Sequence, residues 1–135
     1  MRLDLNKIHE LCGEIGLAST IRSPEELAIE LADGVVLRFH RSDKDPDGMV
    51  QFEGTPWHSH GYFTFTDSHG YETEMSYFDV VSGLAEGRIL VCEKWNRGQL
   101  ADRWLDHQDY VGPFRFMKEG DEVRIWRISR QEPSS

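Results

Sequence analysis

Short segments in which apolar and polar residues alternate, separated by turns that contain glycine, recur along most of this chain. Alternation with a period of two is typical of strands that bury one face, and strands joined by short turns pair antiparallel. Asp33-Gly34 is a strong turn signal, because this dipeptide favours the two-residue turn of a β-hairpin. The strands predicted in this way cover residues 35–40, 49–53, 62–66, 71–75, 88–95 and 100–107.

Two further segments have the three- and four-residue spacing of an amphipathic helix. Residues 4–16 place five apolar side chains on one face before Gly16 supplies a stop. Residues 76–87 open with Ser76-x-x-Asp79, which resembles a capping box, and continue with apolar residues at helical spacing. We therefore predict an α+β fold, in which two or three α-helices pack on a mainly antiparallel β-sheet built from hairpins.

Residues 25–33 are compatible with two structures. The motif S-P-E-E at residues 23–26 has the form of a helix start, since Ser can cap, Pro fits the first turn and Glu completes a capping box. From Leu27 onward, however, apolar residues alternate, as they would in a strand that leads into the turn at Asp33-Gly34. Periodicity does not decide between helix and strand over so short a window, so both stay open.

The last predicted hairpin has the most specific register. With Glu119-Gly120 as its turn, apolar residues face one another across the two strands and an opposite-charge pair lies beside the turn. The predicted pairs are Phe116 with Val123, Phe114 with Ile125, and Lys118 with Asp121.

Length, charge and cysteine content exclude several classes of protein. The 135 residues carry 15 Lys and Arg against 24 Asp and Glu, a formal charge of −9, which repels phosphate backbones and anionic membranes. No segment approaches the roughly 18 apolar residues of a membrane span, and the first residues lack a signal peptide. Cys12 and Cys92 stand apart and are expected to be reduced and buried. We therefore expect one cytoplasmic domain, residues 1–135, with a frayed tail at residues 131–135.

The pair His58-x-His60 supplies the candidate metal ligands. In a strand across residues 57–66, both imidazoles share one face with Tyr62. Imidazole nitrogens suit zinc, copper, iron or nickel, but two of them do not complete a site. A metal-dependent enzyme or metal-binding domain centred on His58 and His60 is therefore the alternative function, with a divalent metal as its cofactor.

A third metal ligand is not found beside this pair in the sequence. A hairpin that pairs residue 66 with residue 72 places Glu74 four residues along the strand from His60, roughly 13 Å away and too far to share a metal. The third ligand would have to come from another strand, with His40 or His107 as candidates. Without it, the histidines lie at the rim of a sheet.

The run D-K-D-P-D-G at residues 43–48 resembles the opening of an EF-hand calcium loop, with oxygen-bearing side chains at alternate positions before a glycine. The bidentate glutamate of that family belongs at the twelfth position, which is Gly54 here. We therefore expect an acidic turn between the strands at 35–40 and 49–53.

The aromatic residues favour a protein-binding function over an enzymatic one. Trp57, Tyr62 and Trp104 lie on or beside predicted strands, with Asp102 and Asp106 close to Trp104. An acidic surface with an aromatic anchor suits a basic partner, because charge speeds the encounter and the aromatic side chain holds it. Small, acidic, cytosolic α+β chains are similar in character to bacterial immunity proteins, which neutralise toxic nucleases or other effectors. No nucleophile elbow, phosphate-binding loop or dinucleotide fingerprint occurs, so we predict a non-enzymatic inhibitor or immunity-type protein that binds a basic partner through these five residues.

Overall fold

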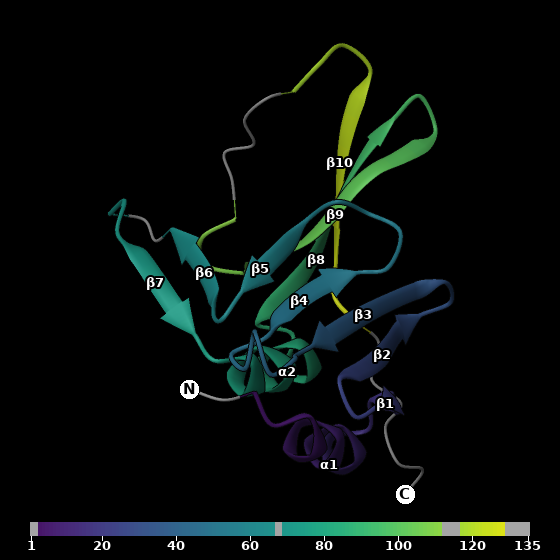
Figure 1. The fold of residues 1–135 in the computed structure, drawn as a ribbon. Helices are drawn as coiled ribbons and strands as arrows, with labels where there is room; N and C mark the ends of the chain where they lie inside the picture. Colours follow the sequence, from purple (N-terminus) through teal and green to yellow (C-terminus); the bar gives the residue numbers. More distant parts are fainter. Residues whose placement is uncertain (1–2, 67–68, 112–116, 129–135) are drawn as a thin grey trace, which may run out of the picture.

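The computed structural model describes residues 3–66, 69–111 and 117–128, which form two helices and ten strands (Figure 1). Every strand pairing is antiparallel, so the predicted α+β class with mainly antiparallel sheet is confirmed. The elements are α1 (Leu5–Ile15), β1 (Ala18–Ser23), β2 (Glu26–Ala32), β3 (Val35–His40), β4 (Met49–Phe52), β5 (His58–His60), β6 (Phe63–Thr66), β7 (Glu72–Met75), α2 (Tyr77–Glu86), β8 (Ile89–Asn96), β9 (Gln99–His107) and β10 (Asp121–Trp126).

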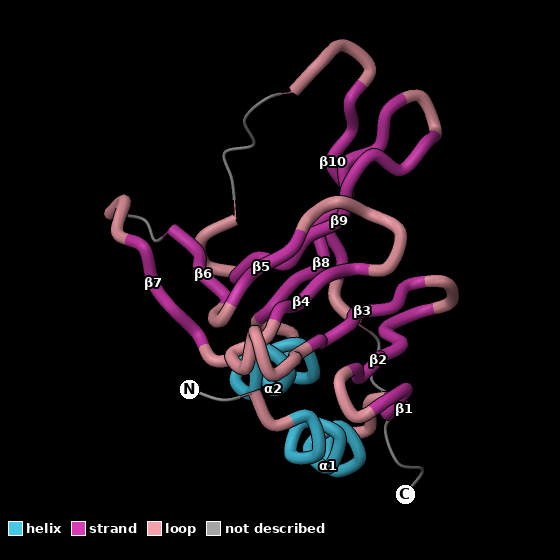
Figure 2. The backbone as a smooth tube through the Cα atoms, viewed as in Figure 1, coloured by secondary structure: helices cyan, strands magenta, loops and turns pink. Residues whose placement is uncertain are grey.

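The strands form three sheets. Strands β1 to β5 follow one another across a five-stranded sheet, β10, β8 and β9 form a three-stranded sheet in that order, and β6 pairs with β7. Strand β4 of the first sheet contacts β9 of the second. The two helices lie together at one end of the sheets, where α1 contacts β1 and α2 contacts β8 (Figure 2).

Residues 25–33, left open by the sequence, form strand β2, which pairs with both β1 and β3. Leu27 and Ile29 are fully buried in this strand, and Gly34 has the positive φ of +74° that the turn after it requires. The S-P-E-E motif does not begin a helix. Ser23 Oγ instead accepts a hydrogen bond of 3.2 Å from the backbone N–H of Glu25 within a turn.

Both predicted helices are confirmed, with the predicted end of α1 at Gly16 and the predicted beginning of α2 at Ser76. The Asp4 carboxylate accepts the Lys7 N–H at 3.1 Å to begin α1, and Gly16 ends it with a left-handed φ of 80°. The Ser76 hydroxyl accepts the Asp79 N–H at 3.1 Å to begin α2. Neither described helix is long and apolar enough to cross a membrane.

The hydrophobic core lies between the two larger sheets and the helices. Cys12 and Cys92 are buried free thiols, as the sequence predicts. The largest fully buried side chains are Phe39, Phe52, Phe63, Leu27, Ile29, Leu37, Leu84, Ile89, Val50, Val80, Val81 and Val91.

The stretch across residues 57–66 is two strands rather than one. Gly61 has a φ of +75°, which breaks the extended backbone between β5 and β6 and takes Tyr62 out of the histidine strand. The hairpin that follows has the predicted register. Its pairs are Phe63 with Met75, Thr64 with Glu74, Phe65 with Thr73, and Thr66 with Glu72.

The C-terminal strand pairs with a distant part of the chain. Strand β10 lies beside β8, which brings Val123 opposite Lys94 and Ile125 opposite Cys92. The predicted partners Phe114 and Phe116 lie outside the described residues, as do residues 131–135. The predicted charge pair of Lys118 and Asp121 stays a prediction, but the two residues meet in a turn, in which the Asp121 carboxylate accepts the Lys118 backbone N–H at 2.7 Å.

Candidate functional site

A pocket of about 310 Å³ opens where the beginnings of α1 and α2 come together. A volume of this size lies at the lower end of the range for binding pockets in proteins. Its walls come from four separate segments of the chain. The lining residues are Leu3, Asp4, Lys7, Ile8, Asp47, Gly61, Tyr62, Ser76, Tyr77 and Phe78.

Backbone hydrogen bonds join the segments that form the walls. The Leu3 N–H donates to the Pro46 carbonyl, and the Gly61 N–H donates to the Gly48 carbonyl, both at 2.9 Å. Gly48 has a φ of +82°, and a Cβ at this position would lie 2.4 Å from Leu3 Cδ2. Only glycine lets residues 43–48, which we call the acidic loop, approach the N-terminal segment this closely.

Tyr77 fixes the inner wall of the pocket. Its hydroxyl donates to the Ser59 carbonyl at 2.8 Å, and its ring packs edge-on against Phe39 at a centroid distance of 5.3 Å. Burial raises the pKa of Tyr77 to about 12, so the phenol is a neutral donor at physiological pH. This wall is therefore uncharged, and a hydrogen bond and a ring contact hold Tyr77 in it.

The mouth of the pocket combines aromatic and charged side chains. Phe78 is 45% exposed and Tyr62 is half-buried, so both present ring surface at the opening. The exposed carboxylates of Asp4 and Asp47 lie here beside the exposed Lys7. The Asp4 carboxylate caps α1, and Asp47 lies on the acidic loop.

The negative charge of the chain is concentrated in one segment of the sequence, which contributes several residues to this pocket. Residues 45–87 contain eight Asp and Glu and no Lys or Arg. The rest of the chain carries 15 basic and 16 acidic residues, which leaves −1 of the total −9. This segregation is a sequence signal that composition alone hides. The eight residues are Asp45, Asp47, Glu53, Asp67, Glu72, Glu74, Asp79 and Glu86.

Four of these carboxylates form what we call the acidic end, namely Asp47, Glu72, Glu74 and Asp79, all of them exposed. They lie on the acidic loop, on β7 and in the first turn of α2. Two of the large exposed hydrophobic residues flank them, Tyr71 at 72% exposure and Phe78 at 45%. In Figure 1, β7 forms the left margin of the fold and its end leads into α2. Of these residues, Asp47 and Phe78 line the pocket, while the others lie on or beside β7 and in the first turn of α2, the segments that lead into and continue its wall.

The predicted partner-binding residues are divided between different places. Tyr62 lies at the pocket. The Trp57 ring packs against Phe52 and Phe63 at centroid distances of 6.1 and 6.4 Å. The Trp57 backbone N–H donates to Asp102 Oδ1 at 3.1 Å, so these two predicted residues are brought together.

Trp104 and Asp106 lie with Asp102 at alternate positions of β9, and each is half-buried. Trp104 pairs with Cys92 of β8, and burial raises the pKa of the Asp106 carboxyl above its ordinary value. A half-buried carboxyl with a raised pKa occurs at functional sites and also where the group only stabilises the local structure. The assignment of these residues to a partner surface stays a prediction.

His58 and His60 lie on one exposed face of β5, with ring centroids 4.9 Å apart. His40 is in the same row of the sheet, but β4 separates it from His60, since Met49 pairs with both. Two strand spacings amount to about 10 Å, too far for ligands of one metal. His107 stacks on Phe65 instead, at 5.0 Å. Among the described residues, no group of three or more His, Cys, Asp or Glu side chains could hold a metal ion.

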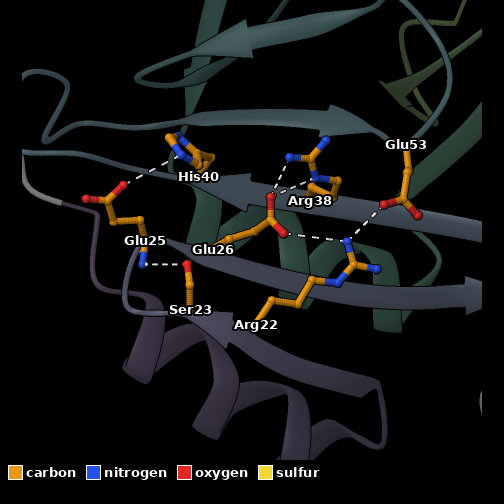
Figure 3. Close-up of polar contacts among 7 residues, drawn as sticks. All are labelled: Arg22, Ser23, Glu25, Glu26, Arg38, His40 and Glu53. Atoms are coloured by element: carbon orange, nitrogen blue, oxygen red, sulfur yellow. Dashed lines mark hydrogen bonds and ion pairs between the residues drawn. The ribbon is translucent and has the colours of Figure 1, made fainter.

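The outer face of the five-stranded sheet carries a paired ionic cluster (Figure 3). Arg22 Nη1 lies 2.9 Å from Glu53 Oε1 and 3.5 Å from Glu26 Oε2, while Arg38 binds the other oxygen of Glu26. Burial acts to raise the pKa of Glu26, but the bonds from Arg38 and Arg22 outweigh it and hold this pKa below its usual value. Because its charges are matched, this cluster is structural.

The pocket with its acidic end and the histidine pair are the features of the described residues that bear on function. Their geometry places the aromatic and acidic side chains at one end of the molecule. Comparisons with family models, curated proteins and solved structures find no match for this chain.

Proposed function

We propose that this chain is a non-enzymatic protein-binding domain, of the inhibitor or immunity type, whose acidic end binds a basic partner protein. The observation that carries the proposal is the absence of Lys and Arg from residues 45–87, which hold eight of the nine net negative charges. Charge that serves solubility alone is best spread over a surface with both signs interspersed. A single-sign field steers an oppositely charged partner and speeds association.

Aromatic residues at the same end supply the anchors that such an interface needs. Phe78 and Tyr62 line a pocket that can take a partner side chain, and Tyr71 lies on the exposed hairpin nearby. Arg and Lys side chains are attracted to aromatic faces as well as to carboxylates. The mouth carries the two carboxylates of Asp4 and Asp47 against the single ammonium of Lys7, and this excess of negative charge beside exposed aromatic rings favours a cationic side chain.

Local structure accounts for part of this charge. Glu53 and Glu86 pair with Arg22 and Arg88. Asp79 stabilises the beginning of α2, and the carboxylates of the edge strand β7 discourage pairing with acidic strands. None of these roles requires the whole of residues 45–87 to lack basic side chains. The remaining charge is what supports binding to a basic partner.

The proposal is tested by capturing proteins from the native host with the immobilised chain and with two double variants. Glu72→Lys/Glu74→Lys reverses charge at the acidic end, and Glu14→Lys/Glu30→Lys makes the same change in net charge on exposed positions of α1 and β2. We expect the wild-type chain and the second variant to capture one basic protein and the first variant to lose it. Association with that protein should slow as the salt concentration rises.

Two results would contradict the proposal. One is a captured partner without a basic surface, and the other is equal capture by both double variants. Equal loss in the two variants would show that net charge alone attracts the partner, which also removes the acidic end as the site.

A second candidate function is the binding of a divalent transition metal by His58 and His60. His58 Nδ1 lies 3.1 Å from the Pro56 carbonyl, and because a carbonyl only accepts, this nitrogen carries the proton. Nε2 of His58 then carries the lone pair that could bind a metal, and the centroids of the two imidazole rings lie 4.9 Å apart. Further ligands would have to come from beyond the described residues or from a partner.

Native mass spectrometry of the chain with added zinc, copper or nickel tests this candidate. His58→Ala/His60→Ala should lose a stoichiometric metal that His9→Ala/His69→Ala retains, because both variants remove two imidazoles. Equal metal content in the two variants would end the candidate.

A further inference from the structure

Strand β7 is an open edge at the acidic end. Within the described residues it pairs with β6 alone, in a two-stranded sheet separate from the other two sheets. Figure 2 shows β7 on the outer side of β6, away from the five-stranded sheet. Alternate backbone N–H and C=O groups of an edge strand point away from its neighbour and form a template for another strand.

The side chains beside this edge leave it accessible. Glu72, Thr73 and Glu74 are all exposed, and Met75 is half-buried at the end of the strand. The opposite strand contributes Thr64 and Thr66, which are exposed on the same face as the two glutamates. An incoming strand would therefore meet backbone groups flanked by small hydroxyls and carboxylates.

Charge decides which kind of strand fits. A second copy of this chain paired through the same edge would bring Glu72 and Glu74 close to the same glutamates of its partner, and like charges across strands are destabilising. A strand with Lys or Arg at alternate positions places its cations on one face, since side chains repeat with a period of two. Those cations lie beside Glu72 and Glu74, so a basic segment is favoured and a second copy is not.

The pocket begins where β7 ends. Strand β7 ends at Met75, and the next three residues, Ser76, Tyr77 and Phe78, line the pocket. A strand added along β7 and continued past Met75 advances by about 3.3 Å per residue. Such a strand runs toward this wall of the pocket.

We propose that the partner docks as an extended segment with basic residues at alternate positions, which pairs with the free edge of β7 and places an end residue in the pocket. This inference rests on the proposed function, in which the acidic end binds a basic protein. It adds the conformation of the bound segment and the main-chain contacts that hold it.

The test compares two synthetic peptides of alternating Lys and Val residues. One has an ordinary backbone, and the other has the same sequence with every backbone nitrogen methylated. Both carry the same charges and side chains, but the second lacks the N–H groups that a strand needs. We expect the ordinary peptide to bind about tenfold more tightly, because several backbone hydrogen bonds are lost in the other. Amide hydrogen exchange at Glu72–Met75 should slow with the ordinary peptide only.

The other outcomes separate this inference from the proposed function. Equal binding of both peptides, with unchanged exchange at β7 and loss of binding in Glu72→Lys/Glu74→Lys, overturns strand addition and leaves the acidic end as a binding site. Absence of binding by either peptide also overturns strand addition, while capture from the host decides separately on the proposed function. Dimerisation that protects the β7 amides would show that a second copy occupies the edge, which overturns the choice of a basic segment.

Discussion

Arg103 on β9 forms a buried ion pair with Glu93 on the neighbouring strand β8. Its Nε and Nη2 atoms both lie 2.7 Å from Glu93 Oε2, and the two side chains are only 8% and 9% exposed. Trp95 Nε1 donates to the other carboxylate oxygen at 3.1 Å, and the guanidinium lies 5.7 Å from the centre of the Phe52 ring on β4. The pair therefore connects the three-stranded sheet to the five-stranded sheet.

Removing one partner of this ion pair should destabilise the fold strongly. Arg103→Met leaves the Glu93 carboxylate buried without a cation, which should lower the free energy of unfolding by about 3–5 kcal/mol. Urea denaturation at neutral pH measures this change. The double variant Glu93→Leu/Arg103→Met should recover most of the loss, because two apolar side chains leave no buried charge. A single variant as stable as the wild type would contradict the role given to this pair.

Gly48→Ala should destabilise the chain by on the order of 3 kcal/mol or more, since it adds steric overlap to an unfavourable backbone conformation. The new methyl group would lie 2.4 Å from Leu3 Cδ2 and 2.8 Å from the His40 carbonyl oxygen, at a φ of +82°. Leu3 lines the pocket, so the same change should also weaken binding at the acidic end. Thermal and urea unfolding measure the first effect, and partner capture measures the second.

Gly34→Ala is the matched control for this substitution. Gly34 has a similar φ of +74°, but a Cβ there would meet nothing within 4 Å. Gly34→Ala should lower the free energy of unfolding only by the cost of placing alanine in the left-handed conformation, about 1–2 kcal/mol. Equal losses in the two variants would mean that the contact with Leu3 does not constrain the acidic loop.

The parts of the fold that could be predicted are those fixed by neighbouring residues. The register of β6 and β7 follows from the alternation of Phe63 and Phe65 and from a short loop. Strand β1 was not predicted, because its residues are exposed or half-buried on both faces and only pairing with β2 makes it a strand. The pairing of β10 with β8 joins segments far apart in sequence, which local patterns do not report.

Residues 25–33 show why local signals can fail to decide a structure. A helix cap contributes about 1 kcal/mol. Full burial of Leu27 and Ile29 in a strand between β1 and β3 contributes about 1.5–3 kcal/mol for each side chain. The tertiary contribution exceeds the local one, so the S-P-E-E motif becomes a turn.

The candidate site was only partly accessible from sequence. The charge segregation in residues 45–87 can be counted directly, whereas the pocket arises from four segments that only the fold brings together. Whether His40 joins His60 depends on strand order, and β4 lies between them. The sequence analysis names Tyr62 as a candidate and the structure places it at the pocket, whereas Phe78 and Asp47, which share this pocket, are not among its candidates.

The chain should lose stability in alkali between pH 9 and pH 12. Burial raises the pKa of Cys92 from 9.0 to about 12 and that of Tyr77 from 10.0 to about 12. Below the ordinary pKa values of 9.0 and 10.0, both groups are protonated in the folded and the unfolded chain, and their contribution to stability is fully present. As the pH rises above these values, the unfolded chain releases the two protons before the folded chain does, so the free energy of unfolding falls. Urea denaturation across this range should show a shallower fall in Tyr77→Phe/Cys92→Ala. Identical slopes in the variant and the wild type would show that these two groups do not titrate in this way.

Asp106→Asn should stabilise the chain at neutral pH. Burial raises the pKa of Asp106 in the folded state, so its ionisation lowers the free energy of unfolding as pH rises above 3.8, and the loss persists at neutral pH. Asparagine has no charge and keeps the oxygen that accepts the His107 N–H at 2.8 Å. Urea denaturation should show a gain that disappears in acid and that the exposed control Asp43→Asn lacks.

The same variant tests whether Asp106 takes part in binding. A charged group that lowers stability is retained most readily where function needs it. If Asp106→Asn is more stable but captures the basic partner less well than Asp43→Asn, the partner contacts the outer face of β9 as well as the acidic end. If it is more stable and captures the partner equally well, Asp106 acts only within β9 and takes no part in binding.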